Sequence, residues 1–250
     1  MLLSVLIPCF NERKTVAVIV DRVARVDLSP LRLEIEIVFV DDGSTDGSLD
    51  EVKGYIAAHP GLNIKTIANP ANRGKGYSIR RALEAASGDF VIIQDADLEY
   101  FPEDWPDLLA PLVSGETDVI YGSRMMRPSG PYPGRAIFDL ALTLENLALR
   151  LCYGSPITDT ATCYKAFRMD LLRSLVLRRD GFAFCPEVTC RLLSSGIPIV
   201  ERPIRYLPRH RLDGKKIKAR HLFEAIWEIV LNRMVHGRKK SLQPGCAQVR

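Results

Sequence analysis

Short runs of apolar, β-branched residues recur along the first half of the chain, separated by amphipathic stretches of helical period. The apolar runs predict strands over residues 2–8, 34–42, 63–69, 89–95 and 118–123. The stretches between them predict helices over 14–26, from 48 to the residue before Pro60, over 77–86 and over 104–113. Continuous apolar strands that alternate with helices are typical of a mostly parallel α/β sheet covered on both faces.

The pattern changes beyond residue 121. A Pro- and Gly-rich segment over 127–135 precedes a predicted helix over 136–151, and short mixed elements follow. We expect a single domain over 1–220 with an elaborated C-terminal part, then an amphipathic helix and a basic tail over 221–250.

The predicted helix over 220–234 has one apolar and one polar side. The polar side carries Arg220, Glu224, Glu228 and Asn232, and the apolar side carries Leu222, Phe223, Ile226, Trp227, Val230 and Met234. Two interpretations fit this pattern: the apolar side packs on its own domain, or it lies in a membrane interface.

Composition indicates an ordinary folded protein. Of the 250 residues, 47% are hydrophobic and 26% are charged, and no apolar run approaches the roughly 20 residues that span a bilayer. The six cysteines form no CxxC pair and the four histidines no HxxH spacing, which argues against a zinc site and favours reduced cytosolic thiols.

Charge is distributed unevenly. Residues 201–250 hold thirteen Lys or Arg against four Asp or Glu, whereas the first 200 residues carry a net negative charge. A basic C-terminal part favours contact with phosphate or an anionic membrane surface. No aromatic platform accompanies the basic residues, so we do not expect nucleic-acid binding.

Carboxylates follow three of the predicted strands. Glu12 follows the first, Asp41 and Asp42 end the second, and Asp95, Asp97 and Glu99 alternate after the fourth. Ligands of parallel sheets bind at the carboxyl ends of the strands. Carboxylates gathered there repel one another unless a cation lies among them, and Mg²⁺ or Mn²⁺ prefers such oxygen ligands.

A glycine-rich segment offers a partner for phosphate. Gly74 and Lys75 of NRGKG stand just before a predicted helix, whose N-terminus favours an anion. Neither a Walker motif nor GxGxxG is present, which argues against nucleotide hydrolysis by a P-loop and against dinucleotide redox chemistry. Carboxylates for a metal beside a diphosphate site indicate a sugar-nucleotide donor.

The order of the motifs narrows this hypothesis. IPCFNE, VDDGSTDGS, NRGKG, QDADLEY, YGSR, DTATCYKAFR and RHRLDGKKI resemble the family-2 glycosyltransferases, especially dolichol-phosphate mannose synthases and related polyprenyl-phosphate glycosyltransferases. The resemblance implies a GT-A, Rossmann-like fold and inverting transfer of a hexose from a UDP- or GDP-sugar to a lipid phosphate. It also implies a cytoplasmic protein bound peripherally at the cytoplasmic face of a membrane.

The resemblance assigns roles to residues. The nucleoside would contact Pro8, Phe10, Glu12 and Asp42, with Asp41 adjacent. Asp95-Ala96-Asp97 would be the DxD motif that holds the metal and diphosphate, with Glu99 as third metal ligand. Arg124 and Arg135 would hold the acceptor phosphate, and Arg211 and Lys216 would close over the donor.

A phosphate acceptor is already an anionic nucleophile, so its transfer chemistry needs no strong base. We place Asp159 near the acceptor end. A hydroxyl acceptor is the alternative within the same fold and would require Asp159 or Glu187 as a base. A non-catalytic sugar-nucleotide-binding protein is the alternative from another class.

Overall fold

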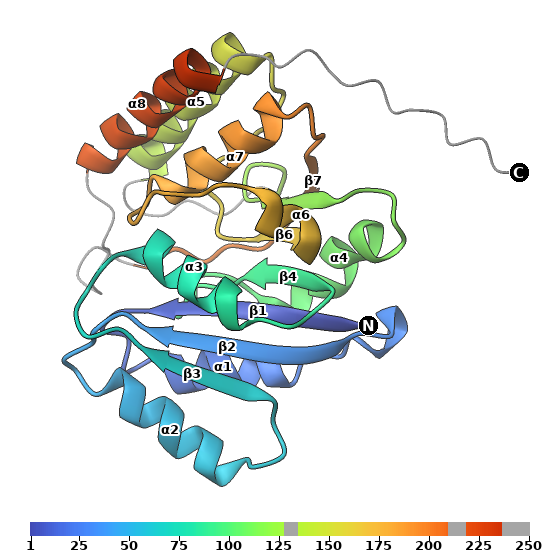
Figure 1. The fold of residues 1–250 in the computed structure, drawn as a ribbon, viewed down its shortest axis with the longest axis vertical. Helices are drawn as coiled ribbons and strands as arrows, with labels where there is room; N and C mark the ends of the chain where they lie inside the picture. The colour runs from blue at the N-terminus through green and yellow to red at the C-terminus, as the bar shows by residue number, and fades with distance from the viewer. Residues whose placement is uncertain (128–134, 210–218, 237–250) are drawn as a thin grey trace, which may run out of the picture.

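The computed structural model describes residues 1–127, 135–209 and 219–236 (Figure 1). Within these residues a single seven-stranded sheet runs in the order β3-β2-β1-β4-β6-β5-β7. The first four strands along the chain are parallel, as the sequence pattern predicts. They are β1 (Leu2–Cys9), β2 (Glu34–Asp41), β3 (Ile64–Ala68) and β4 (Phe90–Ile93).

The second half of the sheet contains one reversal. β6 (Lys165–Arg168) lies between β4 and β5 (Val119–Ser123) and runs antiparallel to both, while β7 (Val200–Pro203) is parallel to β5. The sequence pattern does not reveal β6. The mostly parallel sheet with one antiparallel strand confirms the predicted α/β class.

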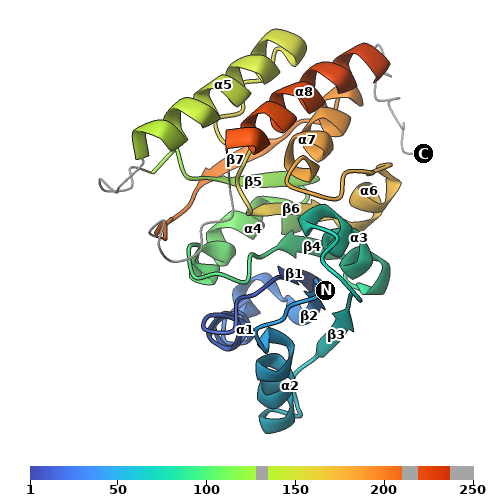
Figure 2. The same cartoon turned by 90° about the vertical axis from the view of Figure 1, so that its left-hand side faces the viewer.

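Helices cover both faces of the sheet. In Figure 2, α1 and α4 lie on one face, and α3, α6 and α7 lie on the other. The core between these layers is built from apolar strand residues with no exposed surface, such as Val5, Val38 and Val91. The N-terminal helices are α1 (Val16–Ala24), α2 (Ser48–Ala58) and α3 (Lys75–Ala85), with a 3₁₀ turn over Ser29–Leu31. Those that follow are α4 (Trp105–Val113), after a 3₁₀ turn over Pro102–Asp104, α5 (Arg135–Tyr153), α6 (Met169–Ser174), α7 (Phe184–Ser194) and α8 (Ala219–His236).

The long helices α5 and α8 lie side by side at the opposite end of the molecule from α2 (Figures 1 and 2). A small second core joins them to α7 through Leu149, Tyr153, Cys190 and Ile229. No helix in the described part of the chain combines the length and hydropathy that a membrane span requires.

The orientation of α8 settles which of its sides packs on the domain. Glu228 and Asn232 of the polar side are buried, and Glu228 Oε2 lies 2.6 Å from Arg179 Nε. Phe223 and Trp227 of the apolar side are 72% and 55% exposed. The expectation that the apolar side packs on the domain is therefore wrong at Phe223 and Trp227. The helix is instead buried along a strip in which Glu228 pairs with Arg179 and which consists of Ala225, Glu228, Ile229 and Asn232.

Candidate active site

The carboxyl ends of β2, β1 and β4 lie next to one another, because these strands are neighbours in the sheet. The side chains expected to form the site follow these ends. β4 stops at Ile93, so Asp95, Asp97 and Glu99 lie in an irregular segment and not on an extended strand. Strand alternation therefore does not set the directions of these carboxylates, and tertiary contacts decide where each one points.

Asp42 holds the NRGKG segment over the end of β2. Its carboxylate accepts hydrogen bonds from the backbone N–H groups of Arg73 and Gly74, at 3.0 and 2.7 Å, and from Asn69 Nδ2 at 2.8 Å. Gly74 has a φ of +102°, and a Cβ there would lie 2.5 Å from the carbonyl oxygen of Asp180. Glycine is required at this position by backbone conformation and by close packing.

Asp41 carries a buried acceptor without a partner. Its Oδ2 accepts a hydrogen bond from the Ser44 N–H, whereas its Oδ1 is buried with no hydrogen-bond partner. Buried polar atoms are nearly always satisfied in folded proteins. Asp41 therefore retains acceptor capacity beside the residue expected to line the nucleoside site.

Asp95 is neutralised by the lysine of NRGKG. Lys75 Nζ lies 2.5 Å from Asp95 Oδ1, and both side chains are largely buried. Burial favours the neutral carboxyl, but the charge and hydrogen bond of Lys75, together with Cys163 and Arg124, lower the pKa of Asp95. The lysine expected to bind phosphate thus lies against the first aspartate of the expected DxD motif.

Asp97 faces a different cation. Arg209 donates from its two terminal nitrogens to Glu12, at 2.9 Å each, and from one of them to Asp97 at 2.9 Å. Burial and the charges of Asp95 and Glu99 raise the pKa of Asp97 to about 7, although Arg209 acts in the opposite direction. Glu12, Asp97 and Glu99 are called here the acidic rim.

Glu99 accepts hydrogen bonds from the chain segment that carries Arg209. Its two carboxylate oxygens accept hydrogen bonds from the Arg209 N–H and from the Tyr206 hydroxyl, each at 2.8 Å. The sequence identifies Glu99 as an important carboxylate but does not reveal these partners, which lie more than a hundred positions away.

The carboxylates of the acidic rim are oxygen ligands, which hard divalent cations such as Mg²⁺ prefer. In this structure all three carboxylates lie close to the guanidinium of Arg209. In the described residues, no three His, Cys, Asp or Glu side chains are arranged to enclose an ion. Mg²⁺ commonly takes one or two carboxylates and completes its shell with substrate phosphates. Asp95 and Asp97 fit that mode of binding.

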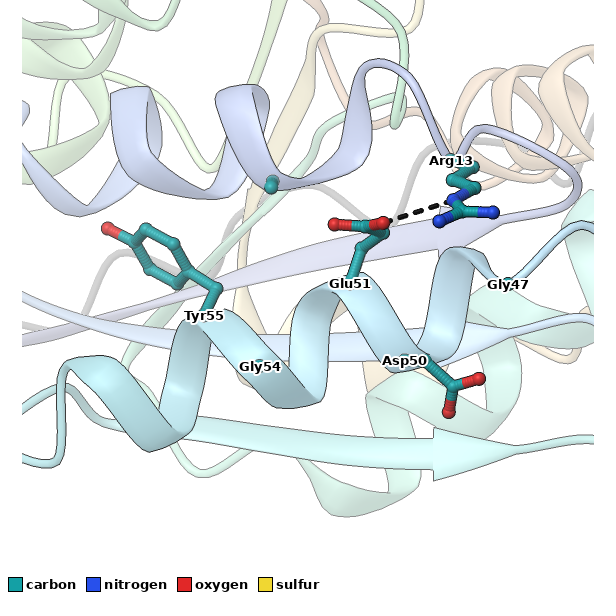
Figure 3. A pocket seen from close by; sticks show the side chains of 7 residues that line it. Arg13, Gly47, Asp50, Glu51, Gly54 and Tyr55 are labelled. Atoms are coloured by element: carbon teal, nitrogen blue, oxygen red, sulfur yellow. Dashed lines mark hydrogen bonds and ion pairs between the residues drawn. The ribbon is translucent and has the colours of Figure 1, made fainter.

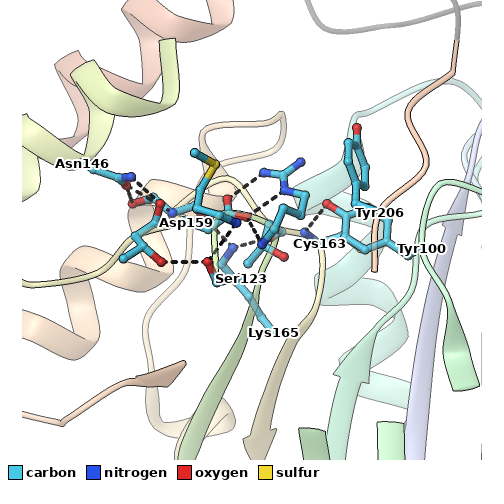
Figure 4. A network of polar contacts seen from close by, with 12 residues as sticks. Tyr100, Ser123, Asn146, Asp159, Cys163, Lys165 and Tyr206 are labelled. Carbon is cyan, nitrogen blue, oxygen red and sulfur yellow. Dashed lines mark hydrogen bonds and ion pairs between the residues drawn. The ribbon is translucent and has the colours of Figure 1, made fainter. Parts of the chain in front are cut away.

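Arg124 and Asp159 form a buried ion pair, and Figure 4 shows the polar network around Asp159. Arg124 donates to Asp159 from Nε and from a terminal nitrogen, at 2.7 Å each, and from its backbone N–H at 2.9 Å. The guanidinium carbon lies 4.8 Å from the ring centroid of Phe138 and 5.0 Å from that of Tyr206. The ring centroid of Tyr100 is 5.9 Å away, so Arg124 meets Asp159 and three rings in this structure.

The loop that carries Asp159 is fixed by polar contacts not predicted from the sequence. Glu201 accepts hydrogen bonds from the backbone N–H groups of Thr158 and Asp159, and Asn146 donates to the Thr158 carbonyl. Lys165 is fully buried and donates from Nζ to two carbonyl oxygens, that of Thr160 at 2.8 Å and that of Thr162 at 2.5 Å (Figure 4). Burial lowers the pKa of Lys165.

Glu187, the other base considered for a hydroxyl acceptor, is also occupied. Its carboxylate accepts hydrogen bonds from the backbone N–H groups of Arg178 and Arg179 at 2.8–3.0 Å. Asp159 and Glu187 therefore both have structural partners. A further buried carboxyl is that of Glu145 on α5, where burial and the charge of Asp159 raise the pKa to about 7.

The remaining predicted residues fall into two groups. Pro8 lies within β1, Phe10 follows it, and the carbonyl of Ala96 accepts a hydrogen bond from Thr15 Oγ1 at 3.0 Å. Arg211 and Lys216 lie outside the described residues, as does the side chain of Arg135 at the start of α5.

A surface pocket of about 400 Å³ lies between α1 and α2 (Figure 3). Arg13 and Glu51 line it and form an ion pair at 3.0 Å, and Tyr55 lines its other end. The acidic rim and Asp95 do not line this pocket, so we do not assign it to the active site.

The chain was compared with known proteins. A model of glycosyl transferase family 2 matches residues 4–176, which is more than half of the chain. The chain belongs to glycosyl transferase family 2. The family match confirms the resemblance inferred from the motifs.

The names of two curated relatives of this family-2 glycosyltransferase include a lipid phosphate. It is 28% identical to the dolichol-phosphate mannosyltransferase of Pyrococcus furiosus over 94% of its own length and 67% of the relative's. It is also 28% identical to the dodecaprenyl-phosphate galacturonate synthase of Rhizobium johnstonii, over 77% of its length and 55% of the relative's. The chain thus spans between half and two thirds of these relatives.

Solved structures show the fold. Glucosyl-3-phosphoglycerate synthase from Mycobacterium tuberculosis, in complex with Mn²⁺, UDP and glucosyl-3-phosphoglycerate, superposes with a TM-score of 0.64 at 23% identity. The alignment covers 93% of this chain and 78% of that one. The family-2 glycosyltransferase described here therefore has a GT-A-like fold, as the resemblance implies.

Proposed function

We propose that this family-2 glycosyltransferase transfers a hexose, with inversion, from a UDP- or GDP-sugar to a polyprenyl phosphate, with Mg²⁺ or Mn²⁺. The observation that carries the proposal is the set of carboxylates at the ends of β1, β2 and β4, where Asp95 and Asp97 each face a protein cation. The names of the two curated relatives support a lipid-phosphate acceptor.

The donor would lie along the carboxyl ends of β1 and β2. Asp41 offers an unsatisfied buried acceptor that suits a nucleobase N–H group. Asp95 and Asp97 would hold the metal, which supplies charge neutralisation to the leaving diphosphate when bound. Lys75, which contacts Asp95, would bind a diphosphate oxygen.

The acceptor would be activated by its own charge. A phosphate oxygen attacks the anomeric carbon, the bond from that carbon to the diphosphate breaks, and the diphosphate leaves with the bonding electrons. No proton has to be removed from the nucleophile, so no general base is required. Asp159 and Glu187, the two carboxylates considered as bases, are engaged in hydrogen bonds.

The experiment that tests this proposal follows a labelled sugar. The purified protein is incubated with UDP-glucose or GDP-mannose, divalent metal and polyprenyl phosphate, and the label is measured in the organic phase. We expect lipid-linked sugar with one of the two donors and no product in EDTA. Failure with every nucleotide sugar would contradict the proposal.

A lipid acceptor implies a membrane contact, and we place it on α5 and α8. Each helix exposes a set of large apolar side chains, and the two helices lie side by side (Figure 2). The exposed residues, 39–78% accessible, are Leu140, Leu144, Leu147 and Leu151 on α5, and Phe223, Trp227, Met234 and Val235 on α8. We propose that they form one apolar surface of the kind that marks interaction sites.

The double variant Leu147→Glu with Trp227→Glu is expected to bind anionic liposomes about tenfold more weakly or worse than the unchanged protein, because two large apolar groups are lost. Flotation with vesicles that contain phosphatidylserine measures this. Val176→Glu, at an exposed apolar residue outside the two helices, serves as the matched control and should bind as the unchanged protein does. Equal binding of the double variant would refute this surface as the contact.

A further inference from the structure

Arg209 lies in the middle of the acidic rim. Its terminal nitrogens contact Glu12 twice and Asp97 once, all at 2.9 Å, and its Nε lies 3.9 Å from Glu99 Oε1. Its side chain is 20% exposed, so these charges interact with little screening by water. The ion pairs raise the pKa of Arg209, and the guanidinium stays charged.

The position of Arg209 is fixed by a short strap, defined as residues 205–209. The backbone N–H groups of Leu207 and Arg209 donate to the carbonyl and the carboxylate of Glu99, each at 2.8 Å. Tyr206 donates its hydroxyl to the other carboxylate oxygen of Glu99, and Arg205 pairs with Asp104 at 2.7 Å. Four of the five strap residues are therefore tied to the 99–104 stretch.

The strap and a divalent cation need the same carboxylates. Asp97 is the second aspartate of the DxD motif, yet one of its oxygens already bonds to Arg209. A guanidinium and a divalent cation on one carboxylate repel each other strongly when largely buried. The rim therefore accommodates one of the two at a time.

We infer that Arg209 is an internal counter-cation, which occupies the acidic rim until a divalent cation arriving with the donor diphosphate displaces it from Asp97. This inference rests on the proposed metal and donor site. Its consequence is ordered binding: the metal alone competes poorly against three ion pairs, whereas metal and diphosphate together supply both new charge and new ligands. The guanidinium that is released then faces an incoming anion.

Displacement of the strap would also reach the acceptor end. The Tyr206 ring that is anchored to Glu99 also lies 5.0 Å from the guanidinium carbon of Arg124. A strap that moves away from Glu99 takes one of the three neighbouring rings from Arg124. Donor binding is thereby coupled to the surroundings of the Arg124 and Asp159 pair.

The test is a Mn²⁺ titration of Arg209→Gln followed by electron paramagnetic resonance, with no nucleotide present. Because the competing cation is removed, we expect Mn²⁺ to bind the variant at least about tenfold more tightly than the unchanged protein. The additional gain in Mn²⁺ affinity caused by UDP or GDP should shrink accordingly. Arg202→Gln, which removes an exposed cation that lies outside the strap and faces Glu116, should leave Mn²⁺ affinity unchanged.

A second variant covers the case in which Arg209→Gln does not fold. Tyr206→Phe keeps every charge and removes one anchor of the strap, so Mn²⁺ affinity should rise severalfold. Unchanged or weaker Mn²⁺ binding in the folded variant would overturn the inference while leaving the proposed function intact, provided that the unchanged protein binds Mn²⁺ with UDP or GDP. If neither the unchanged protein nor any variant binds Mn²⁺, with or without nucleotide, both this inference and the proposed function are overturned.

Discussion

Replacing Asp97 with alanine is expected to lower kcat/KM for metal-dependent transfer by about a thousandfold or more. A thousandfold corresponds to about 4 kcal/mol of transition-state stabilisation, the size expected for loss of the charge supplied by a bound metal. The fold should remain intact, because burial and neighbouring carboxylates raise the pKa of Asp97 and so oppose its ionised form. Initial rates and circular dichroism measure the two effects.

Asp107→Ala is the matched control for this variant. Asp107 is an exposed aspartate on α4, and its loss should leave kcat/KM unchanged. Full metal-dependent activity in Asp97→Ala would remove Asp97 from the metal site. Equal loss of activity in the control would indicate a general effect of charge.

The second large effect concerns stability. Asp159→Asn is expected to lower the free energy of unfolding by about 3–5 kcal/mol, because it leaves the charge of Arg124 buried without a counter-charge. Both side chains are almost fully buried, at 5% and 0% exposure, and share two side-chain hydrogen bonds of 2.7 Å. Urea unfolding monitored by tryptophan fluorescence measures the change.

Two comparisons sharpen the test of this pair. Asp170→Asn breaks an exposed contact of 3.2 Å with Arg168, and it should change stability little. The double variant Arg124→Met with Asp159→Leu should recover part of the lost stability, because no buried charge remains unpaired. A stable Asp159→Asn protein would show that Arg124 has another counter-charge.

The N-terminal half of the fold could be predicted from the sequence. Strands such as Leu2–Cys9 and Glu34–Asp41 are continuous apolar runs, which are typical of parallel strands buried on both faces. Their polar ends meet at one edge of the sheet because the strands are adjacent and parallel. Asp42 and Asp95 could be identified for this reason.

The strand β6 could not be predicted in the same way. It has four residues, and it begins with Lys165, a residue type that is rarely buried. The lysine is accommodated because carbonyl oxygens of the preceding loop accept hydrogen bonds from its Nζ. A sequence pattern records neither those acceptors nor the antiparallel insertion between β4 and β5.

Ion pairs between residues far apart in the chain could not be predicted from the sequence either. Arg209 is 197 positions from Glu12 and 112 from Asp97, so no local spacing encodes their contact. For α8, the helical period could not tell which residues are buried, since the buried strip contains apolar Ala225 and Ile229 as well as polar Glu228 and Asn232. That depends on Arg179, which lies against Glu228 from another part of the chain.

The central claim is that the acceptor is a phosphate at the end of a polyprenyl chain. The most direct test compares polyprenyl phosphate with the corresponding polyprenol, using labelled UDP-glucose and GDP-mannose with Mn²⁺ and counting the label in the organic phase. We expect labelled lipid with the phosphate and none with the alcohol, because Asp159 and Glu187, the two carboxylates considered as bases for a hydroxyl group, are engaged in hydrogen bonds. Equal transfer to the polyprenol, or transfer to a water-soluble hydroxyl acceptor alone, would contradict it.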